Sequence, residues 1–340
     1  MSPFVTVLVP NYNHARFLPQ RLDSIVAQTF RDYELIALDD CSTDDSRAVL
    51  TEYAQRVPMR LVFNDKNSGT PFIQWRRGAE LATGEYLWIA ESDDFADPRL
   101  LEVLVERVRR HPNIGIAYCQ SLMVDERGEI VGNMQHWTAG LDPERWKHDF
   151  VNHGPDEVAR YLIRRNTIPN ASAALVRGEL LLEAVRDAER LRLAGDWWTW
   201  ARVLLTSDVA FVAEPLNRFR MHHRSVRDTT APREHCQELF AVMAHICSRV
   251  AVAPAARLEA FREAFRLWLR CLATPGFRPD AAWLWNVHAN ARRVFPRATP
   301  HMAWHLARWA VGLRPPGVAP AGTQPPLSPP ESPRSAAESS

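Results

Sequence analysis

The chain has 340 residues, of which 46% are hydrophobic, and its formal net charge at pH 7 is +1. This apolar content is enough for a sizeable core and excludes an intrinsically disordered protein. The near-zero net charge gives no support to nucleic-acid binding through bulk charge, so we expect no nucleic-acid partner.

The cysteines and the hydrophobic segments favour a cytoplasmic protein. The five cysteines are widely spaced and include no CxxC pair, which indicates neither a zinc cluster nor a disulfide framework. The N-terminus shows no basic region followed by a cleavage site, as a secretory signal would. No segment reaches the roughly 20 apolar residues that cross a bilayer. The longest candidate, residues 302–313, is interrupted by His305 and Arg308.

Strand and helix patterns alternate over residues 1–120. Apolar and β-branched runs predict strands at 4–10, 34–38, 60–63, 85–90 and 114–119, with helices between them. Ser42 and Asp45 have the spacing of a capping box at the start of one helix. Asp97 and Pro98 predict the N-cap and first turn of another helix. This alternation predicts an α/β fold with a mostly parallel sheet and right-handed crossovers.

Polar clusters follow three of these predicted strands. They are Asn11-Tyr12-Asn13, Asp39-Asp40 and Glu91-Ser92-Asp93-Asp94. Each cluster alone is typical of a solvated turn. Because sheets of this class bind ligands at the carboxyl ends of their strands, the three clusters together predict one binding site.

The pattern changes after about Gly132. Helices are predicted at 156–165 and 196–205, and strands at 172–176 and 209–212. Only helical periodicity follows up to residue 313, and residues 314–340 are rich in Pro, Ser, Ala and Gly. We therefore expect a first domain at 1–230, a helical extension at 231–313 and a disordered tail at 314–340.

Short motifs occur in a fixed order along the first domain. They are VTVLVPNYN at 5–13, SIVAQTF at 24–30, ELIALDDCSTD at 34–44, NSG at 67–69, ATGEY at 82–86 and ESDDF at 91–95. Together they resemble the family 2 glycosyltransferases, inverting enzymes of the GT-A fold, over residues 4–225. Residues 67–94 resemble a subgroup from bacterial surface-polysaccharide clusters.

The resemblance implies a transferase that moves a sugar from a nucleotide-diphosphate donor to a hydroxyl acceptor, a glycan or a lipid-linked glycan. It assigns the nucleotide sugar to residues 1–120 and the acceptor to residues 121–230.

The acidic cluster matches the family's D-x-D motif. A diphosphate leaving group carries charge that a divalent cation with hard oxygen ligands can neutralise. The resemblance implies Asp93 as the metal ligand and Asp94 as a supporting donor-site residue. Glu91 stands where the family usually has an aspartate near the ribose, and its side chain is one methylene longer than that aspartate. We expect Mn²⁺ or Mg²⁺ as the cofactor.

The resemblance also implies a nucleobase pocket at the ends of the first two strands. Asp40 matches the carboxylate that reads a base such as uracil, and Pro10 and Tyr12 would line the same pocket. For Asp39 we expect a turn-forming or capping role.

The catalytic base is expected at Asp196, in Gly195-Asp196-Trp197-Trp198, where the family carries its catalytic carboxylate at a helix start. Inversion needs a carboxylate that removes the proton of the acceptor hydroxyl. A plain N-cap is the alternative role. Trp197, Trp198 and Trp200 are candidates for an acceptor platform, although this spacing predicts that at least one belongs to the core.

Residues 219–225, FRMHHRS, resemble the family's closing segment Y-R-x-H-x-x-S. In that register His222 is a second metal ligand, which would favour Mn²⁺ because imidazole suits manganese better than magnesium. Arg220 and Arg224 are candidates for contact with the diphosphate. Many family members carry an arginine where this chain has Gln74-Trp75-Arg76-Arg77, and two alternatives stay open. Either these arginines supply the contact or the donor sits differently.

Two further alternatives concern the whole chain and its extension. The same cleft could serve a nucleotide-sugar-binding protein without turnover. Basic residues of the extension lie among tryptophans (Arg292, Arg293, Arg297 and Arg308 with Trp304 and Trp309). They indicate either ordinary helical packing or peripheral contact with an anionic membrane, at its inner face, as a lipid-linked acceptor would require.

Overall fold

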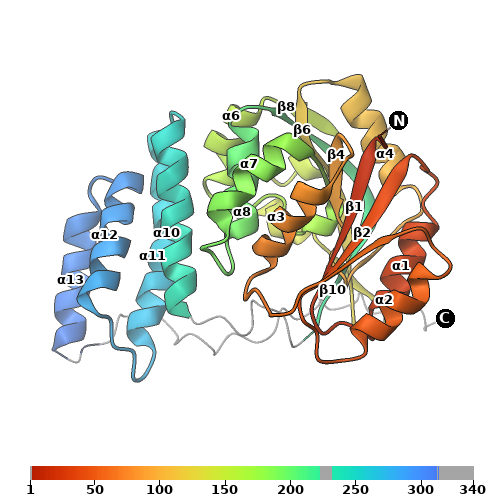
Figure 1. Cartoon of the computed structure of the whole chain (residues 1–340). Helices are drawn as coiled ribbons and strands as arrows, with labels where there is room; N and C mark the ends of the chain where they lie inside the picture. Colours follow the sequence, from red (N-terminus) through yellow and green to blue (C-terminus); the bar gives the residue numbers. More distant parts are fainter. Residues whose placement is uncertain (1, 223–231, 312, 314–340) are drawn as a thin grey trace, which may run out of the picture.

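The computed structural model describes residues 2–222, 232–311 and 313. Arg224 and the predicted tail at 314–340 lie outside these residues. Figure 1 shows a layered α/β unit and, beside it, a group of helices formed by the last described part of the chain.

A ten-stranded sheet runs through the α/β unit in the order β3-β2-β1-β4-β9-β6-β10-β5, with β7 and β8 paired to β6 and β10. The strands are β1 (Val5–Asn11), β2 (Tyr33–Asp39), β3 (Arg60–Phe63), β4 (Tyr86–Ile89), β5 (Phe95–Ala96), β6 (Ile114–Val124), β7 (Ile130–Asn133), β8 (Phe150–Asn152), β9 (Ala174–Arg177) and β10 (Asp208–Arg220). Strands β3, β2, β1 and β4 are parallel, and so are β6 and β10. The predicted α/β class and mostly parallel sheet are therefore confirmed. The strand that joins the two parallel groups, β9, is antiparallel to β4 and to β6.

Two apolar cores cover the two faces of this sheet. The helices of the α/β unit are α1 (Leu18–Val26), α2 (Ser46–Ala54), α3 (Pro71–Leu81), α4 (Leu100–Arg110), α5 (Gln135–Ala139), α6 (Gly154–Glu157), α7 (Gly178–Ala188) and α8 (Gly195–Leu204). Val5, Val7 and Val9 of β1 pack with α1, α2 and α4, whereas Leu8 packs with α3, α7 and α8. The continuous apolar run of β1 thus reflects burial on both faces.

Two local predictions are wrong. Helix α2 begins after Asp45, and the Ser42 hydroxyl instead accepts hydrogen bonds from Asn11 and Asn13. Helix α4 is flanked by Arg99 rather than Asp97, whose carboxylate accepts the Arg99 N–H. The side chains of Ser42 and Asp97 make other hydrogen bonds, which the spacing of residues in the sequence cannot show. The helix expected at 156–165 is present, as α6 followed directly by a π-helical turn at Val158–Leu162.

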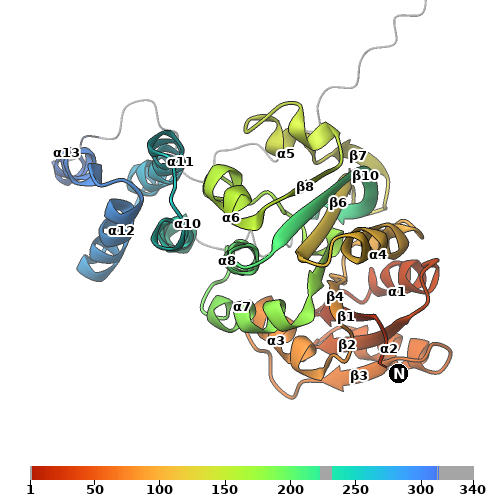
Figure 2. The same cartoon turned by 90° about the horizontal axis from the view of Figure 1, so that it is seen from above.

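The extension consists of α10 (Pro232–Arg249), α11 (Pro254–Ala273), α12 (Ala281–Val294) and α13 (Ala298–Ala310). Seen from above in Figure 2, α10 lies next to α6 and α8, and α12 and α13 lie farther out. Buried side chains of α10, α11 and α12 belong to the same apolar cluster as α3, α7 and α8. Among the described helices, none has the length and apolar character needed to cross a bilayer.

Candidate functional site

The acidic cluster forms the loop that follows β4. Ser92 and Asp94 are buried, and the Glu91 carboxylate accepts a hydrogen bond of 2.8 Å from Trp75 Nε1 of α3. Burial, with the charge of Asp93 second, raises the pKa of Glu91 to about 8. Glu91 is therefore held inside the site by an aromatic donor, and its environment favours the protonated carboxyl.

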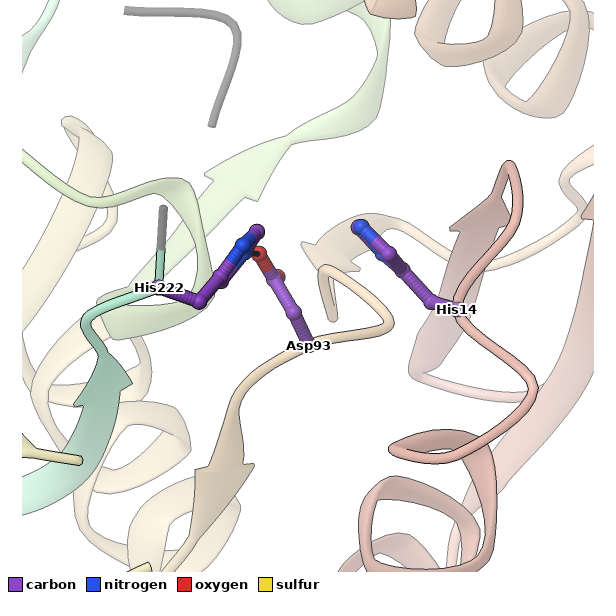
Figure 3. A group of neighbouring side chains, drawn as sticks. All are labelled: His14, Asp93 and His222. Atoms are coloured by element: carbon purple, nitrogen blue, oxygen red, sulfur yellow. Dashed lines mark hydrogen bonds and ion pairs between the residues drawn. The ribbon is translucent and has the colours of Figure 1, made fainter. Parts of the chain in front are cut away.

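Two histidines flank Asp93 in Figure 3. His222 Nε2 lies 2.9 Å from Asp93 Oδ2, and His14 Nδ1 lies 2.8 Å from Ser92 Oγ. One ligand atom from each of His14, Asp93 and His222 lies within 4.8 Å of the other two. Two imidazoles and one carboxylate are a donor set that fits a first-row divalent cation such as Mn²⁺. The predicted pair of Asp93 and His222 is thus brought together.

Sequence reasoning missed His14. It follows the Asn11-Tyr12-Asn13 cluster directly, at the carboxyl end of β1, and this position was the available signal. Burial lowers the pKa of His14, which keeps the imidazole neutral and able to bind a metal. For Asp93, burial raises the pKa, but the hydrogen bond with His222 and smaller electrostatic contributions from the surrounding groups outweigh it. The pKa of Asp93 is lowered, so its carboxylate is ionised.

A fully buried arginine, Arg21 of α1, lies behind the acidic loop. Its Nε donates to the Glu91 carbonyl at 2.9 Å, and its Nη2 donates to Ser172 Oγ at 3.1 Å. Burial lowers the pKa of Arg21 to about 10, while the nearby carboxylates, Asp94 first, oppose that shift. The guanidinium stays charged at neutral pH and offsets part of the negative charge of the loop.

Asp94 and Arg220 fasten the far side of the loop. The Asp94 carboxylate accepts from the Arg220 backbone N–H at 2.9 Å and from Asn170 Nδ2 at 3.0 Å. Burial, followed by the charge of Asp93, raises the pKa of Asp94 to about 6. The Arg220 guanidinium donates to the Asp93 carbonyl at 2.7 Å and to the carbonyls of Asp125 and Glu126, each at 3.0 Å. Arg220 therefore holds the loop in this conformation instead of presenting free donors to a diphosphate.

The predicted nucleobase residues lie at the ends of β1 and β2. Tyr12 is 45% exposed, and Asp40 is buried. The Asp40 carboxylate accepts hydrogen bonds from Asn64 Nδ2 at 2.6 Å, from the Ser68 hydroxyl at 2.7 Å and from Gln74 Nε2 at 2.8 Å. Asp40 thus shapes the loop after β3. Pro10 lies within buried β1.

Asp39 has the turn-forming role expected of it. Its carboxylate accepts from Asn11 Nδ2, from the Ser42 N–H and from Arg47 Nε.

Residues 74–77 of helix α3 differ from the family pattern, and the structure shows what each of these side chains contacts. Gln74 and Trp75 face the site, through Asp40 and Glu91 respectively. Arg76 is paired with Glu80 and Glu189, and Arg77 donates to Asn64. The two arginines are therefore engaged by protein partners, and the amide and indole of this segment contact the site carboxylates.

Asp196 is the second residue of α8. Its carboxylate accepts a hydrogen bond of 2.9 Å from Asn166 Nδ2. The segment 166–172 carries three polar residues that sequence reasoning missed. Asn166 reaches Asp196, Asn170 reaches Asp94, and Ser172 reaches Arg21. One short segment thus contacts both the predicted base and the loop that carries the predicted metal ligand.

The tryptophans of α8 divide between core and partial exposure. Trp197 and Trp200 are buried, and their indole N–H groups donate to the carbonyls of Leu162 and Ile168. Both therefore belong to the core and are no acceptor platform. Trp198 is half-buried and packs on His245 of α10, with ring centroids 4.3 Å apart.

The extension contacts the turn before Asp196. The buried carboxylate of Glu238, in α10, accepts three backbone N–H groups, from Arg192 at 2.7 Å and from Leu193 and Ala194 at 2.9 Å each. These residues directly precede α8. A side chain of the extension therefore fixes the backbone from which Asp196 projects.

Solved structures share this architecture. S. aureus TarS (residues 1–349) in complex with UDP-GlcNAc superposes with a TM-score of 0.65 at 15% identity, covering 92% of this chain and 90% of that one. The mannosyltransferase PcManGT from Pyrobaculum calidifontis, in complex with GDP-Man and Mn²⁺, gives a TM-score of 0.55 at 18% identity, covering 92% and 81%. This likeness confirms the GT-A type of fold.

Sequence relatives identify the family. Residues 6–167 match the model of glycosyl transferase family 2. An uncharacterized glycosyltransferase of Nostoc sp. is 32% identical over 249 residues, which is 68% of this chain and 70% of that protein. Escherichia coli chondroitin synthase is 27% identical over 135 residues, or 40% of this chain and 20% of the synthase, so this chain matches only a minor part of it. The chain belongs to glycosyl transferase family 2 and is a glycosyltransferase.

Proposed function

We propose that this glycosyltransferase moves a sugar, with inversion, from a nucleotide diphosphate to a hydroxyl of a glycan or lipid-linked glycan in bacterial surface-polysaccharide synthesis. One observation carries the proposal: segment 166–172 connects Asp196 to the loop of Asp93, next to His222. A candidate base and candidate metal ligands are thus joined in one hydrogen-bonded frame. The similarity to chondroitin synthase supports the choice of a polysaccharide product.

Asp93 and His222 would hold the divalent cation. The ionised carboxylate of Asp93 and the imidazole of His222 are suitable ligands, and the imidazole favours Mn²⁺ over Mg²⁺. When bound, such a cation neutralises the charge that develops on the departing diphosphate. The Mn²⁺ in the structure of PcManGT supports this choice of metal.

Asp196 would act as the base. Its carboxylate takes the proton of the acceptor hydroxyl while the hydroxyl oxygen bonds to the anomeric carbon, on the face opposite the diphosphate. The bond from the anomeric carbon to the diphosphate oxygen breaks, and the diphosphate leaves with that electron pair. Asn166 orients the carboxylate through its 2.9 Å hydrogen bond.

The donor would lie along the ends of β1, β2 and β4. Tyr12, exposed at the end of β1, would contact the nucleobase beside Pro10, and Asp40 would read its edge. Glu91 would approach the ribose, and the nucleotide sugars bound by the structural neighbours support this class of donor. We assign Arg220 and Asp94 to support of the loop; a diphosphate contact by Arg224 remains a prediction.

The outer helices of the extension would contact an anionic membrane surface, where a lipid-linked acceptor is found. Residues 281–313 contain four arginines and no Asp, Glu or Lys. Trp285 and Trp304 are 75% and 54% exposed. Exposed tryptophans beside arginines favour the interface of a negatively charged bilayer.

The substitution Asp196→Asn tests the transfer itself. It should lower the transfer rate by about 10²–10⁴-fold, because the amide cannot accept the proton. Nucleotide affinity should stay near that of the wild type. A screen of nucleotide sugars with and without Mn²⁺ would supply the substrate for this measurement.

The matched control is Asp156→Asn, an exposed aspartate in the first turn of α6, which should leave transfer unchanged. Retained transfer in Asp196→Asn would disprove the base assignment. If the wild-type protein binds nucleotide sugars but turns over none, the alternative of a binding protein would hold.

A further inference from the structure

We propose that His14 is a third metal ligand, so that the cation is held by two imidazoles and one carboxylate. The inference rests on the proposed cation at Asp93 and His222. It adds a ligand from another part of the fold, because His14 comes from the turn between β1 and α1 whereas the other two follow β4 and β10. Figure 3 shows His14 and His222 on the two sides of Asp93.

The surroundings of His14 resemble those of a ligand held in place before the metal arrives. Ser92 Oγ, 2.8 Å from His14 Nδ1, is buried and belongs to the acidic loop itself. Metal-binding histidines usually donate their second ring N–H to such a polar group, which fixes the tautomer and the ring orientation. With Nδ1 engaged by Ser92, Nε2 is the nitrogen that would bind the cation.

Ring packing restricts the two imidazoles to this arrangement. The rings of His14 and His222 meet edge to face, with centroids 5.5 Å apart, and Phe17 lies 5.9 Å from the first and 5.6 Å from the second. Two ligand atoms that are each about 2.1 Å from one ion can be at most about 4.2 Å apart. Since one ligand atom from each of the three residues already lies within 4.8 Å of the other two, small side-chain rotations would let the three residues share an ion.

A second imidazole changes which metals the site prefers. Magnesium and calcium favour oxygen ligands, whereas imidazole suits first-row transition metals. With a carboxylate and two histidines, the chain should bind Mn²⁺ and Co²⁺ well and Mg²⁺ weakly. Replacing His14 should reduce this preference.

The experiment measures metal affinity, independently of turnover. Mn²⁺ is titrated into the full chain, alone and with UDP or GDP, and free Mn²⁺ is followed by electron paramagnetic resonance. His14→Ala should weaken Mn²⁺ binding roughly tenfold or more, and Asp93→Ala and His222→Ala should do likewise. The Co²⁺ absorption spectrum, which reports the ligands directly, should change in His14→Ala.

His153→Ala is the matched control, because His153 also lies near an aspartate, 3.6 Å from Asp156, but on the surface. It should bind Mn²⁺ like the wild type. His14→Gln guards against a folding defect, since it retains a polar side chain near Ser92; it should fold normally and still lose affinity.

The outcomes separate the two proposals. If His14→Ala and His14→Gln bind Mn²⁺ with wild-type affinity and an unchanged Co²⁺ spectrum while Asp93→Ala does not bind, His14 is no ligand and the proposed cation stands. If the wild type binds no Mn²⁺ even with nucleotide, the proposal of a cation at Asp93 and His222 is itself wrong.

Discussion

The strand-end region around Asp93 and the helical extension use charged residues in opposite ways. In the first region, Arg21, Asp40 and Asp94 are buried, and each is hydrogen-bonded to a residue from another segment: Arg21 to the Glu91 carbonyl, Asp40 to Asn64 and Asp94 to Asn170. In the extension, the charged residues of α12 and α13 are mostly exposed, and the buried positions are apolar. Burying a charge costs free energy unless the charge is paired, so each charged side chain of the first region needs a particular partner. The second is specified mainly by its periodicity, and Glu238 is its point of contact with the site.

Among the substitutions that test this difference between the two regions, we expect Arg21→Met to have the largest effect on stability. Removing the buried guanidinium leaves the Asp93 and Asp94 carboxylates without a nearby cation and the Glu91 carbonyl without its donor, which should cost about 3–5 kcal/mol of unfolding free energy. Urea denaturation monitored by circular dichroism measures it. In the extension, Arg266→Met removes an exposed pair with Glu263 and should change stability by less than about 1 kcal/mol. Equal losses of unfolding free energy in the two variants would contradict the difference between the buried charges of the site and the exposed charges of the extension.

Glu238→Gln tests the contact between the two regions. The amide keeps the shape but removes the charge that accepts three N–H groups, so we expect a loss of about 1–3 kcal/mol. Hydrogen exchange should rise at residues 192–194, and kcat should fall more than KM changes. Glu234→Gln, at an exposed position one turn earlier on α10, is the control. Wild-type exchange and kcat in Glu238→Gln would show that the extension does not support the base.

Reversing charge on the outer helices tests their contact with membranes. The double substitution Arg292→Glu and Arg293→Glu should weaken binding to phosphatidylserine vesicles by about 1 kcal/mol or more for each site. Co-sedimentation with anionic and neutral vesicles measures this. The control is Arg266→Glu on α11. Equal binding of wild type to neutral and anionic vesicles would contradict the electrostatic contact.

The smallest effect concerns His245, which packs on Trp198 where α10 meets α8. Burial lowers the pKa of His245 to about 4, whereas in the unfolded chain it is about 6.5. Between these values the unfolded state binds a proton that the folded state does not, so stability falls as pH drops from 6.5 to 4. Because His245 is partly exposed, we expect about 1 kcal/mol. Denaturation at several pH values should show a shallower slope in His245→Gln, and an unchanged slope would contradict this assignment.

Sequence patterns predicted the features that depend on neighbouring residues and on the order of motifs along the chain. The strand ends with Tyr12, Asp40 and Asp93 follow from apolar runs and motif order, and the meeting of Asp93 with His222 follows from the family resemblance. The patterns could not reveal Arg21, because one arginine in an amphipathic helix resembles any surface residue. Its burial depends on the Glu91 carbonyl, 70 residues later. The capping box at Ser42 failed for a related reason: Asn11 and Asn13 compete for its hydroxyl.

Segment 166–172 has a consequence for the construction of chimaeras with relatives. The family match ends at residue 167, which makes that position an inviting crossover for exchanging acceptor specificity. Such a crossover would separate Asn166 from Asn170, so that one parent would orient Asp196 and the other Asp94. Crossovers placed after α8 keep both contacts within one parent. Changes of acceptor are therefore better sought by single substitutions, for example at the half-buried Trp198, than by exchange of whole halves.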